Sequence, residues 1–574
     1  MDRVDHVKRF LADEDLPVRR LEHWARELGD KTYFYYGEQD RSISFRDFND
    51  MANAFAHSLQ SLGIVKGDRI SLFLKNPLVT SLAMFGIWKA GAIFCPINYN
   101  FKGRLLSYQI NDTKPRLIIT EQSLITLLND IRGDIGKTDI VLHAPSRDEH
   151  DYSADAAFVE LDGQFPRHAF SEMLAGSTEN TGVALSPADR ASIIYTSGTT
   201  GPAKGVIQPH RYIMNYIYPA SRITALDDVH YTELPMYHVG GAYGFVGRGA
   251  FCGNTVAVWD RFNPMDYWRR INAVGASGVL LLDIMIPWLF AMPEGPDDRA
   301  NSVNKATLVP LPPNHNEFAR RFAVDFVYSM YGSTEIGAAT VGVFEELQDG
   351  EGTPPELWKG YSRGEMRRIL TECGYELRSG GEELKKGFIG RPTPLHETAI
   401  LNDQDEECAP GEPGQLAFRP QVSYFFFTEY FGKAETTKEA LRNQWYHTGD
   451  ICYRDEAGIL YFVDRMGGFI RRRGENFSSS QVEMLLTGHP SIALAAAFAI
   501  PPEEGGEDDL AIFVVPKAGE AITEEQLREW IKGEMPKFMW PRHIRVVDDL
   551  PKTATLKVEK YKLKEQILAE LGRR

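Results

Sequence analysis

The sequence predicts an α/β protein, with a large N-terminal domain of layered sheets and helices and a small α+β C-terminal domain. Two observations predict this fold class. Short apolar runs typical of buried strands alternate with helical patterns along most of the chain, an order that favours helices packed against largely parallel sheets. Near the end of the 574-residue chain, a glycine pair then precedes a second, shorter set of strand and helix patterns.

The N-terminal strands are predicted from apolar runs, which occupy residues 69–74, 117–120 and 191–195. After the first run, residues 77–90 have a helical pattern with Pro77 in the first turn, where a missing N–H is tolerated. The most apolar stretch, residues 279–292, is interrupted by Asp283 and Pro287. Because it is also shorter than the roughly 20 residues of a membrane span, we interpret it as a buried strand and helix.

One internal segment, residues 342–386, is rich in Gly, Pro and charged residues around a possible helix at 364–373. Loops of this length inside a domain are uncommon and are often ordered excursions. We expect an ordered surface excursion here rather than a functional module.

The domain boundary is predicted near residue 466, which divides the chain into residues 1–466 and 467–574. A strand at 458–463 leads into Asp464-Arg465, and Gly467-Gly468 follows. Glycine adopts backbone conformations that other residues avoid, so this pair is suited to a hinge.

The small domain has its own helix and strand signals. Thr523 to Gln526 form a capping box that opens a helix at 526–533. The remaining expected elements are a helix at 480–486 and strands at 494–500 and 510–515. Between the strands, the acidic loop 503–509 is expected to be a solvated turn.

The composition excludes some classes of function. A formal net charge of -16 repels a phosphate backbone, so nucleic acid is not an expected partner, although small phosphate ligands can still recruit local cations. Five scattered cysteines without a CxxC pair argue against a disulfide scaffold or a zinc site. The N-terminus has no signal-peptide core. We expect a cytoplasmic enzyme without a membrane span, which could be a homodimer.

The strongest functional signal is a loop that follows the strand at 191–195. Residues 195–206 read Tyr-Thr-Ser-Gly-Thr-Thr-Gly-Pro-Ala-Lys-Gly-Val. Glycines let the backbone approach an anion, hydroxyl and N–H groups can hold phosphate oxygens, and Lys204 adds a compact charge. The loop is not a Walker motif, because no Gly-Lys-Ser/Thr opens a helix. The candidate phosphate ligands are Thr196, Ser197, Gly198, Thr199, Thr200 and Lys204.

Further motifs follow the loop. They are Tyr-Gly-Ser-Thr-Glu at 331–335, Trp-Tyr-His-Thr-Gly-Asp at 445–450, Asp-Arg at 464–465, Gly-Glu-Asn at 474–476 and Pro-Lys-Thr-Ala-Thr-Leu-Lys at 551–557. In this order they resemble the motifs of the adenylate-forming superfamily, which contains acyl-CoA synthetases, peptide-synthetase adenylation domains and beetle luciferases. The resemblance extends along nearly the whole chain and implies an AMP-forming acyl-CoA ligase.

In that family, a carboxylate attacks the α-phosphate of ATP to give an acyl-adenylate, and a thiol then displaces AMP. Positioning and charge neutralisation dominate phosphoryl chemistry. The resemblance implies that Lys557 bridges the acid and the α-phosphate, that Glu335 holds Mg²⁺ and that Thr196 takes part in catalysis. It implies that Tyr331 stacks on adenine, that Thr334 bonds the α-phosphate and that Asp450 accepts from ribose beside Arg465. Val309, Gly332 and Ser333 complete the expected nucleotide site.

The thiol step is expected to use the small domain. In the family this domain rotates, so that the catalytic lysine faces the adenylate in one pose and the thiolation segment replaces it in the other. His238 is expected beside the acyl carboxylate, followed by the small residues 240–242, which leave room for an acyl group. Arg473 and Gly474 are candidate coenzyme A contacts.

Three departures from the family pattern leave a weakened adenylation step open. Thr307-Leu308-Val309 replaces a usual Gly-Gly-Ala, Gly468 replaces a common Asp or Lys, and Leu556 replaces a common Gly. Alternatives are therefore a stand-alone enzyme that loads a carrier protein, a ligase that performs only thioesterification, a luciferase-like oxidative activity, or a catalytically silent binding protein.

Within the ligases, the motif at 330–337 and Met535-Pro536-Lys537-Phe538 most resemble the crotonobetaine/carnitine–CoA ligase group. A quaternary ammonium acid needs an aromatic or acidic partner, for which Tyr243 and Asp283 are candidates.

Overall fold

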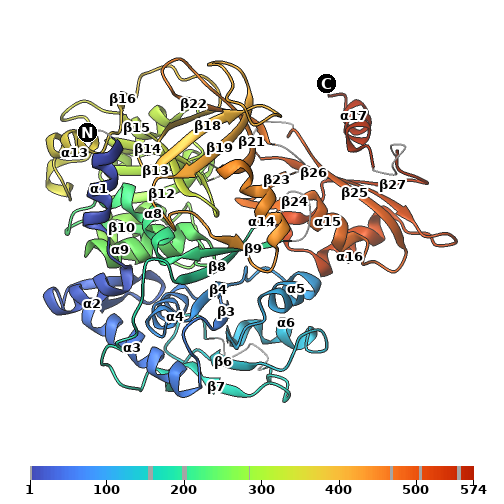
Figure 1. Cartoon of the computed structure of the whole chain (residues 1–574), viewed down its shortest axis with the longest axis horizontal. Helices are drawn as coiled ribbons and strands as arrows, with labels where there is room; N and C mark the ends of the chain where they lie inside the picture. The colour runs from blue at the N-terminus through green and yellow to red at the C-terminus, as the bar shows by residue number, and fades with distance from the viewer. Residues whose placement is uncertain are drawn as a thin grey trace.

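A computed structural model describes residues 3–152, 159–196, 203–283, 285–465, 469–502, 507–551 and 558–573. The predicted α/β fold, with a large N-terminal part and a small C-terminal part, is confirmed. Figure 1 shows the C-terminal elements projecting to one side of the main body. None of the helices in these ranges is long and apolar enough to cross a membrane.

One half of the main body is an eight-stranded sheet in the order β20-β9-β8-β4-β3-β5-β6-β7. Its strands are β3 (Arg69–Phe73), β4 (Ile93–Pro96), β5 (Leu117–Glu121), β6 (Asp139–His143), β7 (Arg167–Ala169), β8 (Arg190–Thr196), β9 (Lys204–Pro209) and β20 (Glu429–Tyr430). The sheet is parallel from β8 to β7, whereas β9 and β20 are antiparallel additions at one edge. The predicted strands at 69–74, 117–120 and 191–195 are confirmed.

Helices accompany this sheet. They are α3 (Phe45–Ser61), α4 (Pro77–Lys89), α5 (Gly103–Thr113) and α6 (Ile125–Asp130). The predicted helix at 77–90 corresponds to α4, which begins where the Asn76 side chain accepts from the N–H groups of Leu78 and Val79. Every residue of α4 is buried, because the helix is apolar on all faces.

The other half is a 14-stranded mixed sheet in the order β18-β19-β21-β22-β17-β15-β14-β13-β12-β10-β11-β1-β2, with β16 paired to β15. Its strands are β1 (Thr32–Tyr36), β2 (Arg41–Ser44), β10 (Val229–Thr232), β11 (Thr255–Val258), β12 (Gly278–Leu282), β13 (Lys305–Val309), β14 (Phe326–Ser333), β15 (Gly337–Glu345), β16 (Leu377–Ser379), β17 (Phe388–Pro392), β18 (His396–Leu401), β19 (Gly414–Pro420), β21 (Tyr446–Arg454) and β22 (Leu460–Arg465). Strands β1 and β10 to β14 form a parallel core, and the strands after β14 add antiparallel pairs.

Two helical segments cross this sheet beside the functional motifs. They are α8 (His210–Ser221) and a π-helix η3 (Gly240–Gly247) that continues into α9 (Arg248–Cys252). The apolar stretch at 279–292 forms β12 and α11 (Met285–Phe290), as predicted for a buried strand and helix.

The excursion at 342–386 is ordered and contains α13 (Arg363–Glu372), close to the predicted helix. Ser362 and Glu365 form a capping box at its start. Its apolar face buries Met366, Ile369 and Leu370 against β14 and β15. The excursion is therefore packed onto the sheet as a cover.

The C-terminal part holds a hairpin of β23 (Phe469–Arg472) and β24 (Glu475–Ser478), and a three-stranded sheet of β25 (Ile492–Ile500), β26 (Asp509–Pro516) and β27 (His543–Val546). Its helices are α15 (Ser479–Leu486), α16 (Glu524–Glu534) and α17 (Lys560–Glu570). The capping box of Thr523 and Gln526 is confirmed. The boundary near residue 466 stays a prediction, and the hinge pair Gly467-Gly468 lies outside the described residues.

The sequence predicts a solvated acidic loop at 503–509. For residues 507–509, the part of this loop that the structure describes, the prediction is wrong. Glu507 accepts from the backbone N–H groups of Arg473 and Gly474, and Asp509 is buried. The β23–β24 turn leaves these N–H groups without strand partners, so a carboxylate satisfies them.

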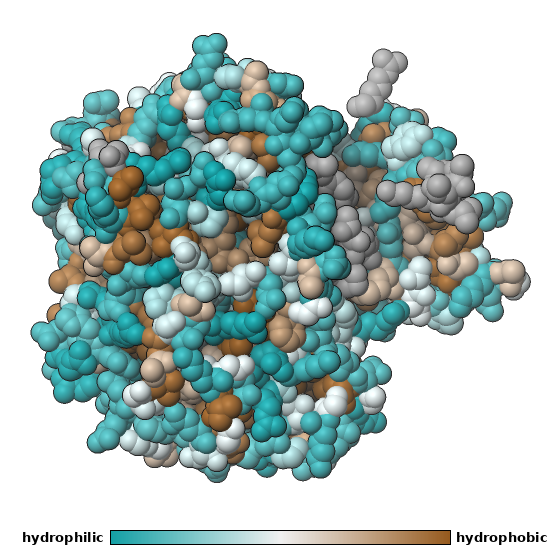
Figure 2. All heavy atoms as spheres, in the orientation of Figure 1, coloured by the Kyte–Doolittle hydropathy of each residue, from teal (hydrophilic) through white to brown (hydrophobic). Residues whose placement is uncertain are grey.

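Figure 2 shows that apolar side chains are scattered over this face of the molecule and do not form one continuous patch. Single exposed apolar residues, such as Met265, are ordinary on protein surfaces.

Candidate active site

The phosphate loop connects two antiparallel strands at the edge of the eight-stranded sheet. Thr196 ends β8, Lys204 begins β9, and the two residues are paired in register. The strands therefore bring both ends of the loop together. Ser197, Gly198, Thr199 and Thr200 lie outside the described residues, so their roles stay predictions.

The side chain of Lys204 faces a small cluster of polar groups. Its Nζ lies 4.9 Å from the centre of the Tyr430 ring, and the Tyr430 hydroxyl donates to Glu335 over 3.0 Å. Burial lowers the pKa of Lys204, Glu335 opposes that shift and Lys433 adds to it. The phosphate loop therefore has two lysines beside it, which suits a polyanionic ligand.

Sequence reasoning missed Tyr430 and Lys433. They reach the loop because β20 pairs with β9, which places Tyr430 opposite Val206. Lys433 then lies near Asp112, at 3.8 Å. A strand of two residues carries little sequence signal of its own, so only the fold brings these residues to the site.

The Tyr-Gly-Ser-Thr-Glu motif forms the turn between β14 and β15. At Gly332 the two strands approach so closely that a Cβ atom would lie 1.9 Å from the carbonyl oxygen of Gly337. The strand register shifts between Tyr331 and Gly332 at this point. Only glycine fits this position without a movement of the backbone.

Buried side chains hold the backbone carbonyls of this turn. The Asn215 amide donates to the Ile336 carbonyl over 2.7 Å, and the Gln208 amide donates to the Thr334 carbonyl over 2.9 Å. The Tyr212 hydroxyl donates to the Ser333 carbonyl over 3.2 Å. These bonds position Ser333, Thr334 and Glu335 without using the side chains that a nucleotide needs.

Glu335 has the chemistry expected of a magnesium ligand. It is 7% exposed, and the Tyr430 hydroxyl donates to only one of its carboxylate oxygens. Mg²⁺ is usually held by one or two carboxylates together with substrate phosphates and water. Beside the phosphate loop, Glu335 therefore fits a Mg²⁺ ion that the substrate brings.

The adenine and ribose motifs lie against each other. The Tyr331 hydroxyl donates to Asp450 over 2.5 Å, and one face of the Tyr331 ring stacks on Phe418 with centroids 6.2 Å apart. Asp450 is buried, so ribose hydroxyls would have to share or replace the bond from Tyr331. The strand register sets Arg465 opposite Asp450, while its side chain lies outside the described part of the chain.

The thiolation segment contacts the N-terminal part directly. The Tyr237 hydroxyl donates to one Glu475 oxygen over 2.6 Å, and His238 Nε2 lies 3.2 Å from the other. Burial alone would raise the pKa of Glu475, but His238 and the hydrogen bonds of Tyr237 and Asn98 outweigh burial and lower it. Glu475 is therefore ionised at neutral pH and pairs with a side chain predicted to lie beside the acyl carboxylate.

The two residues before Glu475 form a two-residue hairpin turn. Arg473 and Gly474 both have positive φ, at 55° and 75°, which matches the tight turn that suits twisted strands. Glycine tolerates this region, whereas arginine does so at a cost of about 1 kcal/mol. Glu507 compensates by accepting from both backbone N–H groups.

The three arginines before Gly474 have different surroundings. Arg471 lies 3.4 Å from Asp283, and Arg472 donates to the Trp540 carbonyl. Arg473 is exposed. Arg473 is therefore the arginine of this group best suited to meet a phosphate of coenzyme A.

A cavity of about 510 Å³ lies between the two parts of the chain. It is lined by Thr196 at the phosphate loop, by His238, and by Glu475 of the thiolation segment. Phe477, Phe538 and Met539 add an apolar wall from the C-terminal side. A pocket with an apolar wall and a few polar groups is typical of small-molecule sites.

Other predicted residues lie at the edges of the site or outside the description. Val309 ends β13 beside Leu282, and Leu282 also faces Gly474. Val309 is therefore paired with the residue that faces the thiolation turn. Lys557 and Leu556 lie outside the described residues, so their roles stay predictions.

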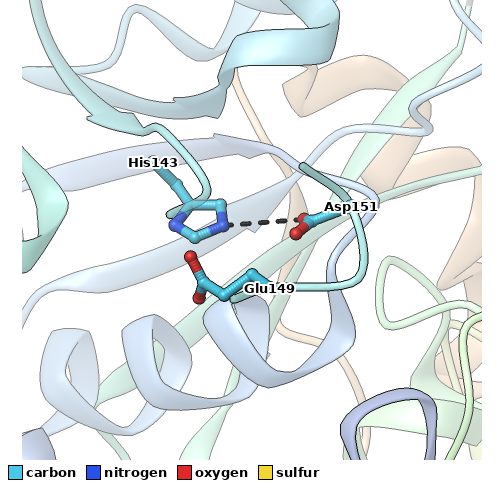
Figure 3. Close-up of side chains that lie close together, drawn as sticks. All are labelled: His143, Glu149 and Asp151. Atoms are coloured by element: carbon cyan, nitrogen blue, oxygen red, sulfur yellow. Dashed lines mark ion pairs between the residues drawn. The ribbon is translucent and has the colours of Figure 1, made fainter. Parts of the chain in front are cut away.

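A second group of possible metal ligands lies elsewhere, at the end of β6. His143, Glu149 and Asp151 have ligand atoms within 4.8 Å of one another. Figure 3 shows the three side chains close together. His143 is 3.7 Å from Asp151, and Glu149 accepts from the Ser146 N–H. Since protein donors already engage these acids, the cluster is accounted for as a loop anchor.

Comparisons with known proteins agree with this geometry. A family model described as AMP-binding enzyme matches residues 21–423, and one described as AMP-binding enzyme C-terminal domain matches residues 481–557. A crotonobetaine/carnitine–CoA ligase of Citrobacter koseri is 28% identical over 94% of this chain and 97% of its own length.

Two solved structures share the fold. An o-succinylbenzoate CoA synthetase of Bacillus subtilis has a TM-score of 0.73 at 21% identity and covers 95% of this chain and 98% of its own. An amide bond synthetase of Marinactinospora thermotolerans has a TM-score of 0.71 at 20% identity, with coverage of 96% and 99%.

Proposed function

This chain belongs to the AMP-binding enzyme family and is an acid–thiol ligase, and we propose that it activates a carboxylic acid with ATP and transfers the acyl group to coenzyme A. The acid is converted to an acyl-adenylate with release of pyrophosphate. The thiol then attacks the acyl carbon, and AMP leaves.

The observation that carries this proposal is the cavity shared by the two halves of the reaction. Thr196 from the phosphate loop, His238 and Glu475 all line it. A thiol that enters this cavity from the C-terminal side would meet an acyl group held beside His238. Its apolar wall suits the uncharged arm that carries a thiol, and the exposed Arg473 suits the phosphates at the other end.

In the adenylation step, Lys204 and Lys433 would neutralise the phosphates while Glu335 holds a Mg²⁺ ion that offsets charge at the attacked phosphorus. The Tyr331 ring, which stacks on Phe418, would contact adenine. Lys557 would supply the cation that bridges the attacking carboxylate and the α-phosphate.

The contact of Glu475 with Tyr237 and His238 supports a thioester-forming pose. In that pose the catalytic lysine has left the site, and the thiolation hairpin occupies the cavity wall. Rotation of the small domain about Gly467-Gly468 would then restore the lysine for the next adenylation.

The division of labour is tested with Lys557→Ala. ATP–pyrophosphate exchange should fall to background, whereas thioester formation from supplied acyl-adenylate should be largely retained. Lys562→Ala is a matched control from the same basic segment, since Lys562 pairs with Glu559 on the exposed surface and should leave both steps unchanged. Equal loss of both steps in Lys557→Ala would contradict the proposal.

The acceptor is tested separately. Free coenzyme A and a phosphopantetheinyl carrier protein are offered to the enzyme together with ATP and acid. Faster thioester formation on free coenzyme A is expected, because the exposed Arg473 can meet the phosphates of coenzyme A. Preference for the carrier protein would instead favour the carrier-loading alternative, and turnover of adenylate without any exchange would favour a thioesterification-only enzyme.

A further inference from the structure

A second cavity lies behind the adenine motif. It encloses about 590 Å³ of space that protein atoms do not fill. Met330, the residue before Tyr331, lines it from β14, and Arg248 lines it from the start of α9. Leu370 and Tyr375 of the excursion contribute to its wall. The cavity is therefore next to the nucleotide motif, and its wall combines apolar side chains with a few polar groups, as small-molecule pockets do.

Arg248 is the notable group in this cavity. Its Nε is buried and has no hydrogen-bond partner, and none of the described residues forms an ion pair with its guanidinium. Its recorded contact is the face of the Phe245 ring, at 5.3 Å. Burial accordingly lowers the pKa of Arg248 below its ordinary value. A largely buried cation without a hydrogen-bonded counter-charge is costly, and proteins normally pair it.

The other cation of the cavity is already neutralised. Lys305 Nζ lies 2.7 Å from Asp228, and Ser277 donates to the same carboxylate over 2.6 Å. This pair is complete by itself. The charge of Arg248 is therefore left over, and the cavity has an excess of positive charge.

Two further groups in the cavity are donors. The Tyr328 hydroxyl is buried and has no hydrogen-bond partner. His230 is neutral, because burial and the nearby Arg248 hold its pKa far below the ordinary value. Its Nδ1 accepts from the Asn254 amide, so the ring proton is on Nε2. A ligand that satisfies all three groups must be an acceptor with negative charge.

The position of Arg248 relates this charge to the acid substrate. His238 precedes η3, and Arg248 follows it on the same continuous helical segment. Ten residues of helix advance by at most about 15 Å at the rise of an α-helix. A Cβ atom added at Gly244 would lie 3.1 Å from the Tyr216 ring, so η3 packs closely against α8 between these two residues.

We propose that this cavity binds the distal end of the acid substrate, and that the distal end carries a second carboxylate recognised by Arg248, Tyr328 and His230. The inference rests on the proposed ligase function. The enzyme would thus activate one carboxylate of a dicarboxylic acid near His238 while the other end is held at Arg248.

The same charges disfavour a quaternary ammonium acid. Tyr243, a candidate partner for such a group, is buried and donates to Gln208 over 2.8 Å, and Asp283 lies 3.4 Å from Arg471. Neither lines the cavity. A trimethylammonium group would instead meet Arg248, a charge of the same sign.

The test compares three series of unbranched acids of matched length, which end in a methyl, a carboxylate or a trimethylammonium group. ATP–pyrophosphate exchange is measured for each acid with wild-type enzyme, Arg248→Met and Arg248→Lys. Calorimetric titration of the acids into the nucleotide-bound enzyme gives a readout besides activity. Arg222→Met is the matched control, because Arg222 is a half-buried arginine on the neighbouring helix end whose charge pairs with Asp13.

Wild-type enzyme should prefer the dicarboxylic acids. Arg248→Met should lower kcat/KM for them by about 30-fold or more, Arg248→Lys by less, and neither should lower kcat/KM for methyl-ended acids. Arg222→Met should change none of these ratios. Should Arg248→Met fail to fold, the ranking of the three series on wild-type enzyme decides.

Equal or better use of methyl-ended or trimethylammonium acids by the wild type would overturn the inference and leave the ligase function intact. An equal loss for all acids in Arg248→Met would do the same. Absence of exchange with every acid would count against the proposed function itself.

Discussion

Two hairpins of the candidate site are held in contrasting ways. The β14–β15 turn, which carries Glu335, is fixed by neutral side chains such as Asn215 and Gln208, buried beneath the sheet. The β23–β24 turn, which carries Glu475, is held by carboxylates and by an ion pair to His238 at the contact between the two parts of the chain. Neutral buried bonds change little with salt or pH, whereas an ion pair with an exposed partner depends on both.

The contrast matches the demands of the two steps. A nucleotide platform must keep one geometry throughout the cycle, so its backbone is satisfied from inside the protein. A contact that forms in one step and breaks in the next must be weak and reversible. Substitutions in the first hairpin should therefore affect stability and both half-reactions. Substitutions in the second hairpin should affect the thiol step alone.

The largest effect is expected for Gly332→Ala. The added Cβ would lie 1.9 Å from a backbone oxygen, so the turn must move. We expect a loss of about 3 kcal/mol in unfolding free energy and a fall of more than about 100-fold in pyrophosphate exchange. Chemical denaturation and exchange assays measure both.

Gly364→Ala is the matched control for that experiment. A Cβ at Gly364 would meet nothing within 4 Å, and the residue lies in the first turn of α13. Stability should stay the same or rise by up to about 1 kcal/mol. Normal exchange in Gly332→Ala would show that the first hairpin is not the rigid platform described here.

A smaller and more selective effect is expected for Glu475→Gln. The amide keeps the shape and can still accept from Tyr237, but the charge opposite His238 is lost. Thioester formation from supplied acyl-adenylate should fall about tenfold, while pyrophosphate exchange stays within about twofold. The exposure of His238 limits the size of this effect. An equal fall in both half-reactions would remove the proposed difference between the hairpins.

Arg473→Gly separates the turn geometry of the second hairpin from its charge. Glycine relieves the positive φ, so the unfolding free energy should rise by up to about 1 kcal/mol. The KM for coenzyme A should rise a few-fold because a cation is lost, with no change in the KM for ATP. Asparagine also tolerates a positive φ, so Arg473→Asn should raise the KM for coenzyme A by the same few-fold factor as Arg473→Gly. An unchanged KM for coenzyme A would show that Arg473 serves the turn alone.

The mildest test uses pH. The pKa of Glu475 is lowered from an ordinary value of 4.5, so its stabilising contribution is complete above that value and disappears as pH falls through the lowered pKa. The contribution of the Glu475 carboxylate to the contact should therefore be constant from about pH 5 to 8 and weaken only in stronger acid. Limited proteolysis between the two parts, compared for wild type and Glu475→Gln, measures this. A wild-type transition near neutral pH would contradict the assignment to Glu475.

The sequence predicts the framework of the fold and the motif turns because both are local signals. The strands at 69–74 and 191–195 are apolar runs, and the turn at Gly332 is contained within five residues. Contacts made by distant segments are not predictable in this way. Tyr430 reaches Glu335 through a two-residue strand, and Glu507 reaches Gly474 from a loop that charge alone indicated to be solvated.

Arg248 illustrates the same limit. In the sequence it is one arginine after a run of small and apolar residues, and nothing nearby marks it as unpaired. Among the described residues no acid forms an ion pair with it, and this is seen only once α8, β14 and the excursion are placed together. A missing partner has no local sequence signature.

The excursion with α13 has a consequence for how such an enzyme can diversify. Leu370 and Tyr375 contribute to the wall of the cavity behind the adenine motif, and they belong to a segment that packs on β14 and β15. Its sequence can drift, lengthen or be exchanged between relatives while the nucleotide chemistry is left untouched. Changes in this segment could therefore alter the choice of acid substrate while the nucleotide site stays the same.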